Sequence, residues 1–140
     1  LQGLAEELGL LKVYETGLNY LKGVITREKG DYAAAISALE KSGEQNKSNP
    51  LAYQVDLAKA YFKNGDLPGA RSALRPLLER NSNDVEALLL LVDIAIAEKD
   101  PDAADKNLVT VKSLLANADD DFYLLQEIKE KDAVAQKLQR

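Results

Sequence analysis

The sequence repeats itself with a period of 34 or 35 residues. The run Gly30-Asp31-Tyr32 aligns with Gly65-Asp66-Leu67 at an offset of 35 residues, and with Lys99-Asp100-Pro101 at a further 34. A repeat of this length is the size of one pair of helices, and it constrains the fold of the whole chain more than any single element does. The chain is therefore predicted to be a short array of helix pairs.

The residues on both sides of each turn fall into register without gaps. After the turn, a small and a large apolar residue stand four apart on one helix face: Ala35 with Leu39, Ala70 with Leu74, and Ala104 with Leu108. Before the turn, the matching positions are Gly23, Ala58 and Val92, followed by Thr26, Tyr61 and Ala95. Each unit is therefore predicted to be two helices that approach closely at the small residues.

The turns carry the residues that end and begin helices. Gly30 and Gly65 suit the left-handed position after a helix, because glycine has no side chain to clash there. Aspartates that can cap the next helix follow at Asp31, Asp66 and Asp100. Further helix starts are predicted at Asn49 with Pro50, and at Asn83 with Glu86, which resembles a capping box.

Together these patterns predict an all-helical chain. The predicted helices run from about Gly3 to Lys12, Tyr14 to Lys29, Tyr32 to Ser42, Pro50 to Asn64, Leu67 to Arg80, Asp84 to Glu98, Pro101 to Ala116 and Asp120 to Leu138. No run alternates with period two between turn signals, so no strand is predicted. Pro76 lies inside a predicted helix and is expected to bend it, because proline removes one N–H bond.

Composition argues against several classes of function. The 140 residues contain no His and no Cys, which removes the usual catalytic triads and zinc sites, so neither an enzyme nor a cofactor is predicted. The net charge of −5 comes without a basic stripe, so nucleic acid is a poor partner. The longest apolar stretch, 87–97, is far shorter than the roughly 20 residues of a membrane-spanning helix, so no membrane insertion is predicted.

One acidic run has the chemistry of a metal ligand set. Asp119, Asp120 and Asp121 are consecutive carboxylates, and Ca²⁺ prefers carboxylate oxygens. The run lacks the alternating spacing, the Gly and the distal Glu of an EF-hand loop. These acids are therefore predicted to cap the last helix and meet its positive N-terminal dipole, and no metal site is predicted.

The central repeat resembles the tetratricopeptide repeat family. The matching residues are Ala58, Tyr61, Gly65, Asp66, Ala70 and Leu74, and the resemblance extends over about residues 16–118. It implies an all-α, right-handed α-α superhelix of about three helix pairs plus flanking helices, in a single domain over 1–140. The parts would be a partial repeat at 1–15, repeats at about 16–49, 50–84 and 85–118, and a terminal helix at 119–140.

The resemblance also implies a function. In this family the first helix of each repeat lines a concave groove that binds peptides or helices of other proteins, and catalysis is rare. Carried onto this sequence, the groove residues are Tyr20, Val24, Arg27, Val55, Lys59, Phe62, Lys63, Leu89, Asp93 and Ile96. The chain is thus expected to be a non-catalytic scaffold for a protein or peptide partner, within a larger protein such as a bacterial envelope or assembly component. The absence of cysteine leans slightly toward an extracytoplasmic, periplasmic location.

One subgroup of the family binds a C-terminal carboxylate through a clamp of Lys, Asn and Arg side chains. The corresponding sites in this sequence are Tyr20, Val24, Asp56, Glu86 and Leu90. The resemblance therefore implies that no cationic clamp forms at these sites.

Two groove residues carry sharper expectations. Phe62 projects about 100° away from Tyr61 on a helix, so it faces the groove as a binding anchor or packs on a neighbouring helix. Asp93 interrupts an apolar run, where a buried, unpaired carboxylate would cost several kcal/mol. Asp93 is expected either to receive a cation or an N–H group from a partner, or to pair with Lys59 or Lys63.

Apolar stripes near both ends of the sequence need a cover. The first consists of Leu4, Leu8 and Leu11, and the last of Leu125, Ile128, Val134 and Leu138. The favoured interpretation makes the first stripe the second helix of a truncated repeat and the last a capping helix. The alternative function is a structural spacer or homo-oligomerisation module, with a homodimer formed through one exposed end.

Overall fold

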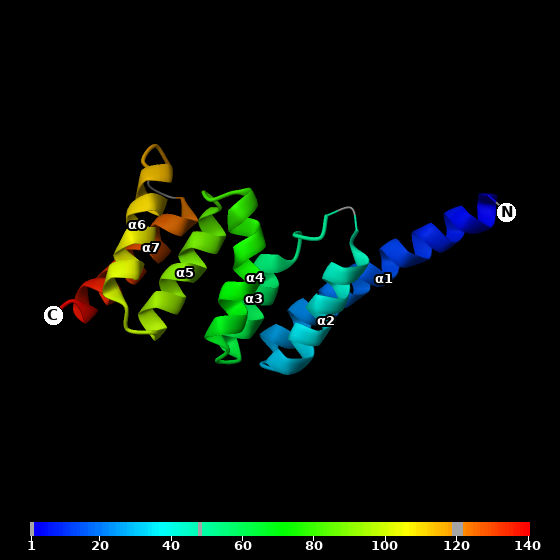
Figure 1. Ribbon diagram of the computed structural model, residues 1–140, viewed down its shortest axis with the longest axis horizontal. Coiled ribbons are helices and arrows are strands. Elements are labelled where there is room, and N and C mark those ends of the chain that lie inside the picture. The colour runs from blue at the N-terminus through cyan, green and yellow to red at the C-terminus, as the bar shows by residue number, and fades with distance from the viewer. Residues whose placement is uncertain (1, 48, 119–121) are drawn as a thin grey trace. The chain divides into compact units, whose positions relative to one another are not determined.

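The computed structural model describes residues 2–47, 49–118 and 122–140 (Figure 1). Every regular element within these ranges is a helix, which confirms the predicted all-α fold class. The helices are α1 (Gln2–Glu28), α2 (Tyr32–Gln45), α3 (Gln54–Lys63), α4 (Leu67–Arg80), α5 (Val85–Ala97), α6 (Pro101–Leu114) and α7 (Tyr123–Leu138).

The helices form two compact units, Leu1–Pro76 and Leu77–Arg140. The boundary lies inside α4, directly after Pro76. The proline does not end this helix, which continues to Arg80 although one N–H is missing from its hydrogen-bond ladder. Each unit has a hydrophobic core of its own.

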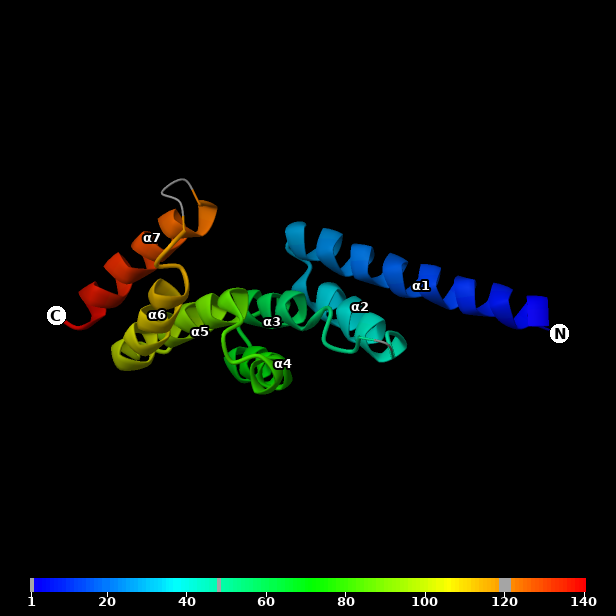
Figure 2. The ribbon, with the colours of Figure 1, turned by 90° about the horizontal axis from the view of Figure 1, so that it is seen from above.

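Helix α1 is much longer than its neighbour α2, with 27 residues against 14, and its N-terminal half runs past the end of α2 (Figure 1, Figure 2). The predicted break between helices at 3–12 and 14–29 was wrong. Residues 12–14 contain no proline, no left-handed residue and no N-capping side chain, so nothing ends the helix there. Residues 2–15 of α1 are consequently all exposed.

Three turns between paired helices share one hydrogen-bonding pattern. In the first, the N–H of Gly30 bonds to the carbonyl of Arg27 at 3.0 Å, and the N–H of Asp31 bonds to the carbonyl of Thr26 at 2.9 Å. The same two bonds recur in the turns at 65–66 and 99–100. Gly30 and Gly65 are left-handed as predicted, with φ of +83° and +80°, and Lys99 adopts the same conformation with φ of +58°. One turn geometry is thus built twice with glycine and once with lysine.

The aspartates after these turns cap the next helices, as predicted. Their side chains accept hydrogen bonds from N–H groups three residues later, at 3.1 Å for Asp31, 2.8 Å for Asp66 and 3.0 Å for Asp100. Each bond satisfies one N–H group that the first helical turn cannot pair by itself.

Two other predicted helix starts were wrong. Helix α3 begins at Gln54 and not at Pro50, because residues 50–53 form turns with bonds from the N–H of Ala52 to Asn49 and from that of Gln54 to Leu51. Helix α5 is capped by Asp84, which accepts the N–H of Ala87 at 2.9 Å, one residue after the predicted Asn83. The predicted start of the last helix at Asp120 lies outside the described residues.

The repeated apolar positions form the cores, as predicted. At most 1% of each residue is exposed at Ala35, Leu39, Ala70, Leu74, Ala104 and Leu108. In the first unit, a Cβ placed on Gly23 would lie 2.6 Å from Leu39 Cγ, so a glycine is what allows α1 and α2 to approach. In the second unit, α5, α6 and α7 share one core that includes Leu88, Val92, Leu108, Val111 and Ile128.

Candidate functional site

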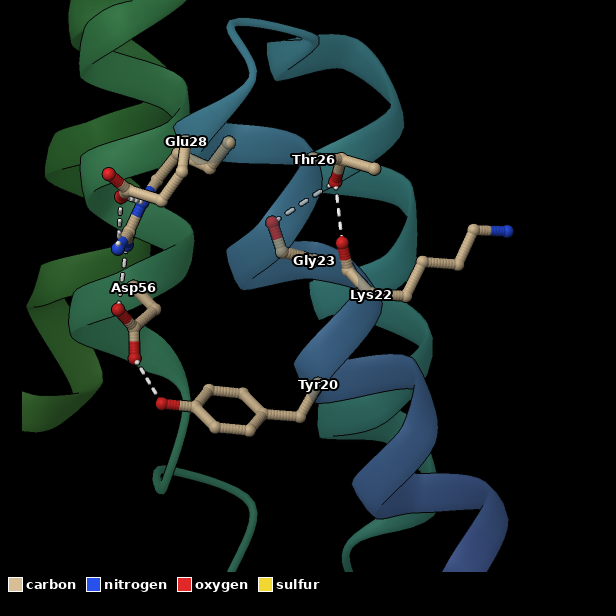
Figure 3. A network of polar contacts seen from close by, with 7 residues as sticks. Tyr20, Lys22, Gly23, Thr26, Glu28 and Asp56 are labelled. Carbon is tan, nitrogen blue, oxygen red and sulfur yellow. Dashed lines mark hydrogen bonds and ion pairs between the residues drawn. The ribbon is translucent and has the colours of Figure 1, made fainter.

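Asp56 on α3 joins two of the predicted groove residues on α1 (Figure 3). Its Oδ2 accepts a hydrogen bond from the Tyr20 hydroxyl at 3.1 Å, and its Oδ1 accepts one from Arg27 Nη1 at 2.7 Å. Sequence reasoning placed Asp56 at a clamp site of the family but did not identify it as the residue that connects these helices. The sequence did offer one clue, which is the negative charge of Asp56. An acidic residue at that site can pair with nearby cations such as Arg27.

Arg27 lies between two carboxylates. Besides its contact with Asp56, its Nη2 is 3.1 Å from Glu28 Oε1, and its side chain is only 15% exposed. Burial by itself would lower the pKa of Arg27, but the hydrogen bond and charge of Asp56, together with Glu28, outweigh burial and raise that pKa. The guanidinium is therefore a fixed positive charge whose orientation is set by α3.

The Tyr20 ring stacks on Tyr53, which directly precedes α3. The ring centroids are 4.6 Å apart and the planes differ by 24°. Burial raises the pKa of Tyr20, and the charge and hydrogen bond of Asp56 raise it further. The hydroxyl therefore stays protonated at neutral pH and keeps donating to Asp56. Tyr20 thus uses both its ring and its hydroxyl to attach α1 to the start of α3.

Three predicted groove residues come together in one pocket of about 280 Å³. Arg27 of α1 and Lys59 and Lys63 of α3 line it, with Glu28 and Tyr32 completing the wall. The lining thus carries three cations and one carboxylate, on a chain whose net charge is −5. Glu28 and Tyr32 were not predicted, because they are the last residue of α1 and the first residue of α2, outside the helix face that the resemblance defines.

The apolar members of the predicted groove in the first unit lie on the same two helices. Val24 of α1 and Val55 and Phe62 of α3 are all half-buried. Phe62 lies three residues after Lys59 on α3, but it is not among the residues that line the cationic pocket.

In the second unit, the predicted groove face of α5 contacts the terminal helix α7 of the same chain. Leu89 is 3% exposed and belongs to the core that includes Leu124 and Ile128 of α7, and Ile96 packs against that core. The expectation that Leu89 contacts a partner in the groove is therefore corrected, because Leu89 is buried in the core that α5 shares with α7. The predicted capping role of the last helix accounts for this burial.

Asp93 is paired inside the protein, but not with the predicted lysines. Its Oδ1 accepts a hydrogen bond from Lys131 Nζ of α7, and Lys131 also lies 3.2 Å from Glu127. Pairing with Lys59 or Lys63 was therefore wrong, and so was the alternative of a carboxylate waiting for a partner. Asp132, next to Lys131, pairs with Lys112 of α6 at 2.8 Å. Neither ion pair could be found from the repeat pattern, because α7, which supplies Lys131 and Asp132, lies outside the aligned repeats.

The described residues contain no group of three or more acidic side chains placed to hold a metal ion. The acidic run at 119–121 lies outside the described part of the chain, so its predicted capping role stays a prediction. Within the described residues, no helix is both long enough and apolar enough to cross a membrane.

Comparison with known proteins gives a match to a family model and similarity to solved structures. The tetratricopeptide repeat family model matches residues 27–84. The structure is similar to the TPR2B domain of yeast Sti1 in its complex with pHsp70, with a TM-score of 0.74, 22% sequence identity, and coverage of 91% of this chain and 99% of that chain. No curated protein matches the sequence. Together with the repeated helix pairs and their shared turns, these matches show that the chain has a tetratricopeptide-like repeat fold, and that residues 27–84 resemble the family in sequence.

Proposed function

We propose that the chain is a non-catalytic protein-interaction module, and that its first unit binds a carboxylate-bearing segment of a partner protein. The observation that carries the proposal is the pocket lined by Arg27, Lys59 and Lys63. A concentration of cations on an acidic chain attracts a complementary charge more than the rest of the surface does.

The three cations have different parts in this proposal. Arg27 is fixed by Asp56 and Glu28, so it contributes positive potential and rigidity to the wall. Lys63 is exposed, so its ammonium group can turn toward a partner's carboxylate, while the half-buried Lys59 adds positive charge to the pocket wall. Phe62, half-buried on the same helix as Lys59 and Lys63, is a further candidate contact, because aromatic residues dominate the binding energy of many interfaces.

The fold similarity supports the general function of binding a protein. The class of ligand has to be inferred from this chain's own residues. The TPR2B domain of yeast Sti1 is known in a complex with pHsp70, so a domain of this fold takes a protein ligand. At 22% identity the likeness does not transfer a particular ligand. The partner class proposed here therefore rests on the pocket charges.

Peptide binding measured by fluorescence anisotropy tests the proposal. The probe is a fluorescein-labelled peptide of alternating Leu and Glu, and the neutral control peptide carries Gln in place of every Glu. Lys63→Glu is expected to weaken binding of the acidic peptide about tenfold or more, because it reverses a charge at the pocket. Lys106→Glu makes the same charge change at an exposed position on α6, and is expected to alter the affinity by less than about twofold.

Two outcomes would contradict the proposal. Equal losses for the two variants would mean that the peptide responds only to net charge. Equal binding of the acidic and neutral peptides would mean that the cations of the pocket take no part.

A further inference from the structure

Helix α1 presents an apolar face that nothing in the first unit covers. Its opposite face holds Thr16 and Gly23, which are buried against α2. Seven large residues on the open face are each more than half exposed: Leu4, Leu8, Leu11, Tyr14, Leu18, Leu21 and Ile25. Contiguous apolar surface of this extent is rare on a soluble monomer and marks an interaction site.

The seven residues have the spacing of a helix-pairing seam. Successive members are three or four residues apart, and Leu4, Leu11, Leu18 and Ile25 recur every seven residues. The stripe therefore stays on one side of α1 for about three heptads, or roughly 33 Å. A partner that lies along the whole stripe must be another straight helix of similar length.

The amount of surface matches what a stable pair of chains requires. Weighted by their exposed fractions, the seven side chains offer on the order of 800 Å² per chain, the area that each partner contributes to a standard stable interface.

Two charged residues on the stripe indicate which helix can pair with α1 and in which direction it runs. Glu7 lies in the N-terminal half and Lys22 in the C-terminal half, on the same side of α1 as the leucines. In a parallel pair of α1 helices, each of these charges would meet its own copy. In an antiparallel pair with a two-fold axis between Tyr14 and Glu15, Glu7 faces Lys22 of the second copy, and the reverse pair forms as well.

The apolar residues match in the same antiparallel register. Leu4 faces Ile25 of the second copy, Leu8 faces Leu21, and Leu11 faces Leu18. Glu15 lies near the axis, and its carboxylate already has a partner in Lys41 of α2 at 3.4 Å. We propose that two copies of this chain associate through an antiparallel pairing of their α1 helices.

This pairing is compatible with the proposed partner-binding pocket. Arg27 faces α3 on the side of α1 away from the stripe, so dimerisation leaves the pocket of each copy open. Two pockets in one assembly would bind a partner with two acidic segments more tightly than a single pocket does, through effective concentration.

The first test is the mass of the 140-residue chain by sedimentation equilibrium over a wide dilution series. The expected result is a dimer that dissociates on dilution. Leu11→Glu with Leu18→Glu places like charges opposite each other and is expected to give a monomer with unchanged helix content, because both positions are exposed. Val109→Glu changes an equally exposed apolar residue of α6 and is expected to remain dimeric.

Charge exchange tests the register. Glu7→Lys and Lys22→Glu are each expected to weaken dimerisation about tenfold, because each alone opposes like charges. The double variant restores opposite charges and is expected to dimerise like the original chain. If the double variant lost as much dimer affinity as the two single variants lose together, the antiparallel register would be overturned.

Disulfide trapping gives an independent test of direction, since the sequence contains no cysteine. Tyr14→Cys lies at the axis and should cross-link to itself under mild oxidation, whereas Leu4→Cys should cross-link only when mixed with Ile25→Cys. Self-cross-linking of Leu4→Cys would show a parallel pair and contradict the proposal. A monomer at every concentration, or a dimer unaffected by the Leu11 and Leu18 substitutions, would also overturn it, and neither result bears on peptide binding at Lys63.

Discussion

Asp93 of α5 forms an ion pair with Lys131 of α7, a residue 38 positions further along the chain. The side chains are 31% and 13% exposed, so the pair is largely shielded from water. The helix face that would line a groove in the third repeat is therefore already occupied in the second unit. The homologous face of the first unit keeps a cationic pocket, and this difference assigns partner binding to the first unit in our proposal.

The first prediction concerns this ion pair. Lys131→Ala is expected to lower the free energy of unfolding by about 1–3 kcal/mol, because it leaves a partly buried carboxylate without its cation. Lys129→Ala removes an exposed lysine from the same helix and is expected to change it by no more than about 0.5 kcal/mol. Urea unfolding followed by circular dichroism measures both. Equal effects would mean that the pair contributes no more than a surface charge.

The second prediction concerns the contact between α1 and α2. Gly23→Ala would place a methyl group 2.6 Å from Leu39 Cγ and 3.3 Å from the Ala35 carbonyl oxygen. Leu39 is buried, so it cannot move aside freely, and a loss of about 1–3 kcal/mol is expected. This exceeds the gain of up to about 1 kcal/mol that alanine brings to a helix.

Gly17→Ala is the matched control, because it lies on the same helix with nothing within 4 Å of the added atom. It is expected to stabilise the protein by about 0.5–1 kcal/mol in the same unfolding experiment. If Gly23→Ala also stabilised the protein, the close approach of α1 and α2 would not be limited by this glycine.

The third prediction concerns the left-handed lysine. Lys99 has φ of +58° at a position where the other two turns have glycine. Lys99→Gly is expected to raise the free energy of unfolding by about 1 kcal/mol in the same urea unfolding experiment, because it removes the clash between Cβ and the backbone. Lys106→Gly, inside α6, is expected to lower stability by about 1 kcal/mol through loss of helix propensity. A loss of stability in Lys99→Gly would show that the lysine side chain makes a compensating contact.

The fold was predictable from sequence wherever local chemistry repeats. The aspartate caps and the left-handed glycines depend on residues within one turn of the chain, and the buried alanine and leucine positions recur at a fixed period. The absence of a stop signal near Val13 should have predicted one continuous α1, but the leucine stripe before it suggested a separate repeat. The start of α3 was missed because the turns at 50–53 have no strong signature.

The candidate site was only partly predictable, for a physical reason. The family resemblance identifies the helix face to which Arg27, Lys59 and Lys63 were assigned, and the structure brings these three together. The resemblance does not identify which charged side chains pair between helices. The partners of Asp56 and Lys131 are determined by where α3 and α7 lie. That placement depends on packing between segments far apart in the sequence.

The last prediction concerns pH and the contact between α2 and α3. The Tyr61 hydroxyl donates a hydrogen bond to Glu40, and this bond, followed by burial and the charge of Glu40, raises the pKa of Tyr61 to about 12 from an ordinary value of 10.0. In the unfolded chain the phenol loses its proton near its ordinary pKa, whereas the folded protein holds that proton up to about pH 12. The stabilisation is therefore fully present below about pH 10 and is lost as the pH rises through 12.

Tyr61→Phe removes the phenol and isolates this effect. The difference in unfolding free energy between the original chain and Tyr61→Phe is expected to be constant from pH 7 to about 9 and to shrink above about pH 10, measured by urea titration at each pH. Glu40→Gln is the control, because without the carboxylate the same substitution at Tyr61 should give a smaller difference with weaker dependence on pH. A difference that stays constant up to pH 11.5 in the original background would mean that Glu40 does not hold the proton on Tyr61, and that α2 and α3 are joined by packing alone at this point.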